Sequence, residues 1–138
     1  MKKILFLFLR KICRFISDFD GFFTTYTSRI FKTRYKLIGE CNQCGVCCTK
    51  IAIYLSNSFW QYPMLKKFAI NWYSFTYNFT FVWEEEDLRI IVFKCNYLNN
   101  SKCGVYKKRP YICRNYPLVR YFEEPIFLPE CGFKTVCR

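Results

Sequence analysis

Histidine is absent from this chain of 138 residues, and its absence removes several familiar classes of site. Zinc sites of the Cys₂His₂ type and catalytic zinc sites with three histidines both need imidazole ligands. A histidine general base and the Ser-His and Cys-His nucleophilic pairs are excluded for the same reason. The chain also contains neither GxGxxG nor GxxxxGK[ST], so nucleotide binding has no support from the sequence.

Long apolar runs are also scarce. Near the N-terminus, residues 4–9 form an apolar run of six residues that Arg10 and Lys11 end. A signal peptide needs about 7–15 apolar residues and a small-residue cleavage site, and a transmembrane helix needs about 20. We therefore expect a cytoplasmic protein that touches a membrane only at its periphery. In that compartment disulfides are rare and thiols stay reduced.

Acidic residues are outnumbered, with 10 against 22 basic residues and a net charge of +12. Such a charge is typical of proteins that bind nucleic acid or an anionic membrane surface. Several basic residues, however, are sequence neighbours of cysteines, among them Lys50, Lys94 and Lys102. Positive charge beside a thiol lowers its pKa and balances the charge of the thiolate. We interpret these residues as counter-charges, which disfavours nucleic acid as a partner.

Cysteine, by contrast, is abundant, with ten residues. Four of them form a CxxCxxCC run at Cys41, Cys44, Cys47 and Cys48. An even number of cysteines allows five disulfides in an oxidising compartment. Dense thiolate clusters instead hold zinc or iron–sulfur centres, because soft sulfur ligands suit those metals. The expected compartment favours metal over disulfides.

A second cysteine stretch lies between residues 103 and 117. It reads Cys-Gly-Val-Tyr from Cys103, then Arg109-Pro110, then Cys-Arg-Asn-Tyr-Pro from Cys113. Together the two stretches resemble the CxxCxxCC cysteine-cluster family of the YkgJ type, whose members are described as zinc- or iron-chelating. The resemblance covers residues 37–131. A similar cysteine motif occurs in a flagellin lysine methylase, so the resemblance implies an iron–sulfur cluster, with [4Fe–4S] favoured, or zinc.

The resemblance implies metal ligands drawn from both stretches and from the segment between them. These ligands are Cys41, Cys44, Cys47, Cys48, Cys95, Cys103 and Cys113. We add Cys131 as an eighth, which allows either two four-thiolate centres or one cluster with spare thiols. One of the adjacent Cys47 and Cys48 is alternatively a buried bystander, because free cysteine is often buried. Cys13 is expected to be a spectator, and Cys137 is the weakest candidate ligand.

Two arginines beside these cysteines are candidate cofactor-binding residues. Arg109 and Arg114 can donate charge-assisted hydrogen bonds to cluster sulfurs or to an anionic substrate. Equally, they can form salt bridges with Glu40, Glu130 or the acidic run at 84–87. The sequence leaves both interpretations open.

The pattern predicts an α+β fold: a small single domain stapled by the metal site, preceded by an N-terminal amphipathic helix. Apolar residues at helical spacing predict that the helix ends near residues 18–21 and that its apolar face packs on the domain or lies on an anionic membrane. A second short helix is predicted at 28–35. We divide the chain into a basic arm at 1–39 and a cysteine-cluster domain at 40–138, and we expect the arm to be dispensable for metal binding.

Within the domain, hydrophobic periodicity predicts the elements that surround the cysteines. We expect strands at 51–55, 75–81 and 88–93, the last two forming a hairpin, and a helix at 63–73. Residues 96–102 are predicted to be a loop. Pro110 suits the first position of a short helix that stops before Pro117.

Three classes of function remain after these exclusions. The first is a metal- or cluster-binding module. The second is an iron–sulfur-dependent enzyme or accessory component related to protein lysine methylation, as the resemblance suggests. The third is a structural zinc domain that docks to an anionic membrane or nucleic acid through the arm.

Overall fold

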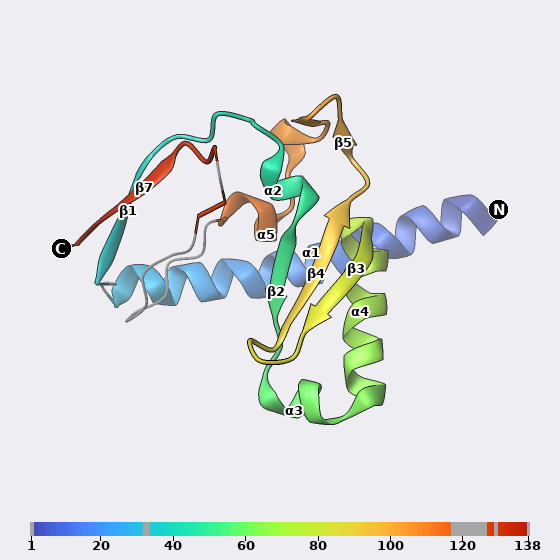
Figure 1. Cartoon of the computed structure of the whole chain (residues 1–138). Helices are drawn as coiled ribbons and strands as arrows, with labels where there is room; N and C mark the ends of the chain where they lie inside the picture. The colour runs from blue at the N-terminus through green and yellow to red at the C-terminus, as the bar shows by residue number, and fades with distance from the viewer. Residues whose placement is uncertain (1, 32–33, 117–126, 129, 138) are drawn as a thin grey trace.

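The computed structural model describes residues 2–31, 34–116, 127–128 and 130–137, and its longest element is the helix α1 (Lys2–Ile30) (Figure 1). The sequence predicted that this helix ends near 18–21 and that a second helix covers 28–35; both predictions are wrong. Gly21 does not end α1; a Cβ at this position would overlap the ring of Tyr111, so glycine lets the helix pack closely against that ring. Residues 28–30, the start of the expected second helix, continue α1, residues 32–33 lie outside the described residues, and strand β1 (Tyr35–Gly39) begins where that helix was expected to end.

A three-stranded antiparallel sheet lies at the centre, in the order β2-β4-β3. Its strands are β2 (Ile51–Tyr54), β3 (Phe79–Glu85) and β4 (Ile90–Cys95). The predicted hairpin is confirmed as β3–β4, but its first strand begins at Phe79 rather than Phe75. The helices α3 (Asn57–Gln61) and α4 (Pro63–Tyr77) connect β2 to β3, and α4 ends only where Asn78 adopts a left-handed conformation with φ 59°. Asparagine tolerates that conformation, so it ends the helix later than the aromatic alternation suggests.

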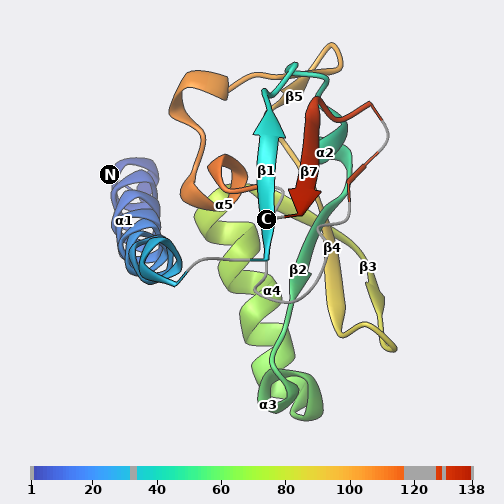
Figure 2. The same ribbon diagram turned by 90° about the vertical axis from the view of Figure 1, so that its left-hand side faces the viewer.

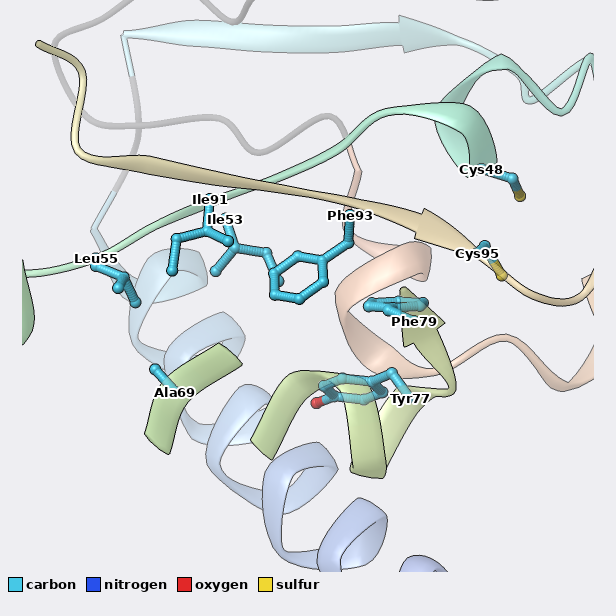
Figure 3. Close-up of a cluster of buried hydrophobic side chains, with 9 residues drawn as sticks. All are labelled: Cys48, Ile53, Leu55, Ala69, Tyr77, Phe79, Ile91, Phe93 and Cys95. Atoms are coloured by element: carbon cyan, nitrogen blue, oxygen red, sulfur yellow. The ribbon is translucent and has the colours of Figure 1, made fainter. Parts of the chain in front are cut away.

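The sheet, α4 and α1 form successive layers, as Figure 2 shows in a view along α1. Phe93 and Ile91 are fully buried between the sheet and α4. Phe93 packs against the rings of Tyr73 and Phe79, each with its centroid 6.1 Å away. Cys48 and Cys95 lie at one end of this cluster (Figure 3). The cysteine stretches are therefore continuous with the hydrophobic core.

Shorter elements complete an α+β fold, as the sequence predicted. They are α2 (Val46–Thr49), β5 (Leu98–Asn99), β6 (Lys102–Cys103), the 3₁₀ turn η1 (Tyr106–Lys108), α5 (Tyr111–Arg114) and β7 (Phe133–Cys137). The predicted loop at 96–102 contains the β5–β6 hairpin, whose two turn residues Asn100 and Ser101 both have positive φ, as a tight hairpin turn requires. The antiparallel pairing of β1 with β7 was not predicted, and it joins residues 35–39 to residues 133–137.

Candidate metal centre

Sheet topology brings the first cysteine stretch to Cys95. Strands β2 and β4 are antiparallel, with Ile51 opposite Phe93, so the start of β2 and the end of β4 lie at the same end of the sheet. Helix α2, which carries Cys47 and Cys48, directly precedes β2, and Cys95 is the last residue of β4. Cys48 and Cys95 are 5% and 4% exposed. The sheet thus fixes two thiols that are 47 residues apart in the sequence.

The thiols of Cys47, Cys48 and Cys95 form a hydrogen-bonded trio. Cys48 donates to the other two sulfurs, which raises the pKa of Cys48 far above its usual range. These two hydrogen bonds are the largest of the causes that lower the pKa of Cys47 to about 7 and that of Cys95 to about 6, against the opposing effect of burial. Cys95 also accepts hydrogen bonds from the backbone N–H groups of Tyr97 and Leu98. Because these donors favour the charged form of sulfur, the trio is suited to hold thiolate.

Gly45 connects the CxxCxxCC stretch to the β5–β6 hairpin. Its φ of +71° lies in the left-handed region, and a Cβ at this position would overlap the carbonyl oxygen of Ser101. Only glycine tolerates both conditions, so the chain can turn into α2 while packed on the hairpin. In that hairpin Cys103 lies opposite Leu98, whose backbone N–H reaches the sulfur of Cys95. Cys103 is therefore brought to the same end of the sheet.

Helix α5 carries Cys113, and the N-terminal helix holds it in place. A carboxylate oxygen of Asp18 accepts a hydrogen bond of 2.9 Å from the backbone N–H of Tyr111, the first residue of α5. One turn earlier on α1, Arg14 donates to the carbonyl oxygen of Lys108. Burial first, and then the neighbouring thiols Cys95 and Cys47, raise the pKa of Cys113 to about 12, against a lowering effect of Arg109. Nothing in the arm's sequence identified Asp18 and Arg14 as supports of a cysteine-bearing helix.

One large cavity, with a volume of about 1320 Å³, collects most of the expected ligands. Its lining includes seven of the eight: Cys41, Cys44, Cys47, Cys48, Cys95, Cys103 and Cys113. They come from five segments: the loop before α2, α2 itself, β4, β6 and α5. Cys13, the expected spectator, and Cys137, the weakest candidate ligand, are outside this lining.

Cys131, the eighth expected ligand, is not among the residues that line the cavity. Two contacts link its surroundings to the site: Asn42, which lies between Cys41 and Cys44, donates to the carbonyl oxygen of Glu130 at 2.8 Å, and Tyr116 lines the cavity. Burial raises the pKa of the Tyr116 hydroxyl, and Cys131, Cys47 and Cys44 raise it further. The backbone N–H of Leu128 donates to that hydroxyl oxygen at 3.2 Å. Tyr116 thus stands beside Cys131 and beside the thiols of the cavity.

The two candidate arginines differ in their contacts. Arg109 is half-buried; it donates to the sulfur of Cys41 at 3.8 Å and to the carbonyl oxygen of Tyr106 at 3.2 Å. Its positive charge also lowers the pKa of Cys47. Arg114 lines the same cavity but is exposed. In the described part of the chain, ion pairs join Arg14 to Asp18 and Lys66 to Glu84. Among the described residues, neither Arg109 nor Arg114 forms a salt bridge with an acidic side chain, which was the alternative interpretation of these two arginines.

Sharing a cavity is not the same as sharing a metal. Among the residues that the structure describes, no three Cys, Asp or Glu side chains form a group positioned to hold a metal ion. The seven sulfurs therefore surround one space without being focused on one point. Their convergence on a single centre stays a prediction, and it requires rotation of the cysteine side chains or movement of the loop before α2.

Comparison with known proteins gives one match. The sequence model named CxxCxxCC, described as a "putative zinc- or iron-chelating domain", matches residues 40–132, which is more than half of the chain. No curated protein and no solved structure matches. The matched region begins immediately before Cys41, includes all eight expected ligands and excludes α1.

Proposed function

Because the chain belongs to the CxxCxxCC family of zinc- or iron-chelating domains, we propose that its cavity cysteines hold an iron–sulfur cluster or zinc. The observation that carries the proposal is the convergence of seven motif cysteines from five segments on one cavity. All of the expected donors are sulfur, which suits zinc and iron–sulfur centres and disfavours magnesium or calcium. We favour a [4Fe–4S] cluster, for which four of these thiolates suffice.

The surroundings of the sulfurs support thiolate ligation. Cys95 has two backbone N–H donors, and Arg109 supplies positive charge beside Cys41 and Cys47. Hydrogen bonds to ligating sulfur and nearby charge adjust the potential of a cluster and the affinity of a zinc site. Ligation would also displace the proton that the Cys47–Cys48–Cys95 trio shares, since metal binding requires deprotonated cysteine. A bound cluster would supply one-electron transfer, whereas zinc would supply stability.

We assign the binding role to residues 40–138 and leave residues 1–39 outside the ligand set. Within that set the core-anchored Cys48, Cys95 and Cys103 are proposed as the fixed ligands. Cys41 and Cys44, which precede α2 in a stretch without regular structure, are proposed to close on the centre. Arg109 would then follow Cys41 as a hydrogen-bond donor to its sulfur.

The size of the cavity favours one second candidate, an iron–sulfur-dependent enzyme or accessory component related to protein lysine methylation. Pockets for small molecules occupy about 300–1,000 Å³, so a cavity of about 1320 Å³ has room for an organic group beside a cluster. Arg10, Arg14 and Arg114 also line it and could receive an anionic substrate. This candidate needs a substrate, whereas the first needs only the metal.

Anaerobic purification with elemental analysis tests the proposal. A cluster predicts iron and acid-labile sulfide in equal amounts, about four of each per chain for [4Fe–4S], with an absorbance near 400 nm. Zinc predicts a colourless protein with about one or two zinc ions. Cys41→Ala and Cys44→Ala should lower the metal content, and Cys137→Ala, outside the cavity, serves as the matched control. Unchanged metal in both variants, or a protein that binds neither metal, would refute the proposal.

A further inference from the structure

Helix α1 contacts the rest of the molecule through a mainly polar side, to which Phe6 adds an edge-to-face ring contact with Phe75 of α4. Arg14 and Asp18 make the hydrogen bonds to η1 and α5, and Gly21 lies against Tyr111. Arg10 lies over the rings of Phe6 and Phe75, at 5.1 and 5.7 Å. Positions 10, 14, 18 and 21 follow each other at helical spacing, so they define a single face that is directed at the domain.

The opposite face of α1 is apolar and exposed. We call it the outward face; its members are Ile4, Leu5, Phe8, Ile12, Phe15, Ile16, Phe19, Phe22, Phe23, Tyr26 and Ile30. Phe15 is 71% exposed and Phe19 is 56% exposed. At 1.5 Å per residue this helix is about 43 Å long. The expectation that the apolar face packs on the domain is therefore wrong, and the outward face exceeds the isolated apolar side chains that a soluble surface normally carries.

The shape of this face favours a flat partner. Figure 2 shows α1 nearly end-on, with the other described elements on one side of it. The outward face is thus a convex ridge rather than a groove that would enclose a peptide. Among the described helices none is long and apolar enough to cross a membrane. A ridge of this kind suits insertion parallel to a lipid surface, with the apolar side chains among the upper acyl chains.

Basic side chains accompany the ridge. Lys2, Lys3 and Lys11 are exposed on α1 itself. Lys107 and Lys108 are exposed on η1, which Arg14 connects to the helix. The chain as a whole carries +12. Anionic headgroups attract such residues, and the attraction falls off within a Debye length.

We propose that α1 lies flat in the surface of an anionic phospholipid membrane, with its outward face among the acyl chains and the cysteine domain carried on its polar face. The two faces then have separate roles, since one docks the protein and the other holds α5 and Cys113. Docking does not depend on what the cysteines bind.

The test is co-sedimentation of the full chain with vesicles of phosphatidylcholine alone and of phosphatidylcholine with phosphatidylglycerol. We expect binding to the anionic vesicles that weakens as salt rises. The combined variant Phe15→Glu and Phe19→Glu should weaken partitioning roughly tenfold or more, because it places charge on the inserted face. Met64→Glu is the matched control, since Met64 is 86% exposed but lies on α4, and it should bind like the unaltered protein.

Three outcomes would overturn the proposal. The first is equal binding by the unaltered protein and the combined variant. The second is the absence of vesicle binding together with a dimer that the combined variant dissociates, which would assign the outward face to a second copy of the chain. The third is undiminished binding to neutral vesicles, which would remove the role of the lysines.

If circular dichroism shows that the combined variant does not fold, Ile4→Glu replaces it, at a position that is 74% exposed near the N-terminal end of α1. The metal content of each variant, measured in parallel, distinguishes failure of docking from failure of the proposed function.

Discussion

The two halves of the cysteine cavity are held in different ways. Cys48 and Cys95 belong to the hydrophobic core and are fixed by the β2–β4 pairing. Cys41 and Cys44 are half-buried and precede α2 in a stretch without regular structure. The first pair, the inner thiols, contributes to packing whether or not a metal binds. The second pair, the outer thiols, has contacts such as the Arg109 hydrogen bond but adds little to the core. Metal binding should therefore order the outer half more than the inner half.

The largest effect should come from Phe93, on which the inner half rests. Phe93 is fully buried and contacts Tyr73, Phe79 and Phe81. Phe93→Ala should lower the free energy of unfolding by about 3–5 kcal/mol, because it leaves a cavity beside Cys95. Urea unfolding in the presence of a chelator measures this change. Phe81→Ala, at a position 39% exposed on the neighbouring strand, is the control and should cost clearly less. If Phe93→Ala and Phe81→Ala lower the free energy of unfolding equally, Phe93 does not have a special role in supporting the inner thiols.

A serine in place of each thiol separates packing from ligation. Cys48→Ser should cost about 1–3 kcal/mol in the chelated protein, because it buries a hydroxyl among apolar neighbours. Cys41→Ser should leave the stability of the chelated protein within about 0.5 kcal/mol. Both variants should bind less metal, which elemental analysis measures. If Cys41→Ser destabilises the chelated protein as much as Cys48→Ser does, the distinction between inner and outer thiols is wrong.

The sequence anticipated the inner half better than the arm, and the reason is physical. The strands at 51–54 and 90–95 have local hydrophobic patterns, and the cysteines at their ends follow from that assignment. The pairing of β1 with β7 and the contact of Asp18 with Tyr111 join residues about a hundred positions apart. No local pattern contains that information. The arm's apolar periodicity correctly indicated a helix but could not say which face would meet the domain.

Arg109 connects the outer thiols to the second cysteine stretch. Loss of a hydrogen bond to a ligating atom changes metal affinity by about 10–100-fold, so Arg109→Ala should weaken binding by that factor. Arg109→Lys keeps the charge but loses the forked geometry that reaches Cys41 and Tyr106 together, and it should recover only part of the affinity. Arg114→Ala is the control, since Arg114 is exposed, and it should change affinity by about fivefold at most. Competition with a chromophoric chelator measures all three, and equal effects of the two alanine variants would contradict the assignment to Arg109.

The smallest expected effect concerns α5, which carries Cys113 and is held by α1. Asp18 accepts the hydrogen bond of the first backbone N–H of α5, in the manner of a helix cap. Loss of such a cap costs about 1 kcal/mol, so Asp18→Ala should lower the free energy of unfolding by that amount. The same change should make Cys113 on α5 react faster with iodoacetamide. Asp18→Asn keeps an acceptor oxygen and should behave almost like the unaltered chain. Labelling of the exposed Cys137 supplies an internal reference.

By the same reasoning, a chain that begins at Tyr35 should lose stability and should label faster at Cys113. This expectation differs from the sequence-based one, in which the arm is dispensable for metal binding. If Asp18→Ala and the shortened chain both keep the original stability and labelling rate, α1 is separable from the cysteine domain, and its polar face only rests on α5 without positioning it.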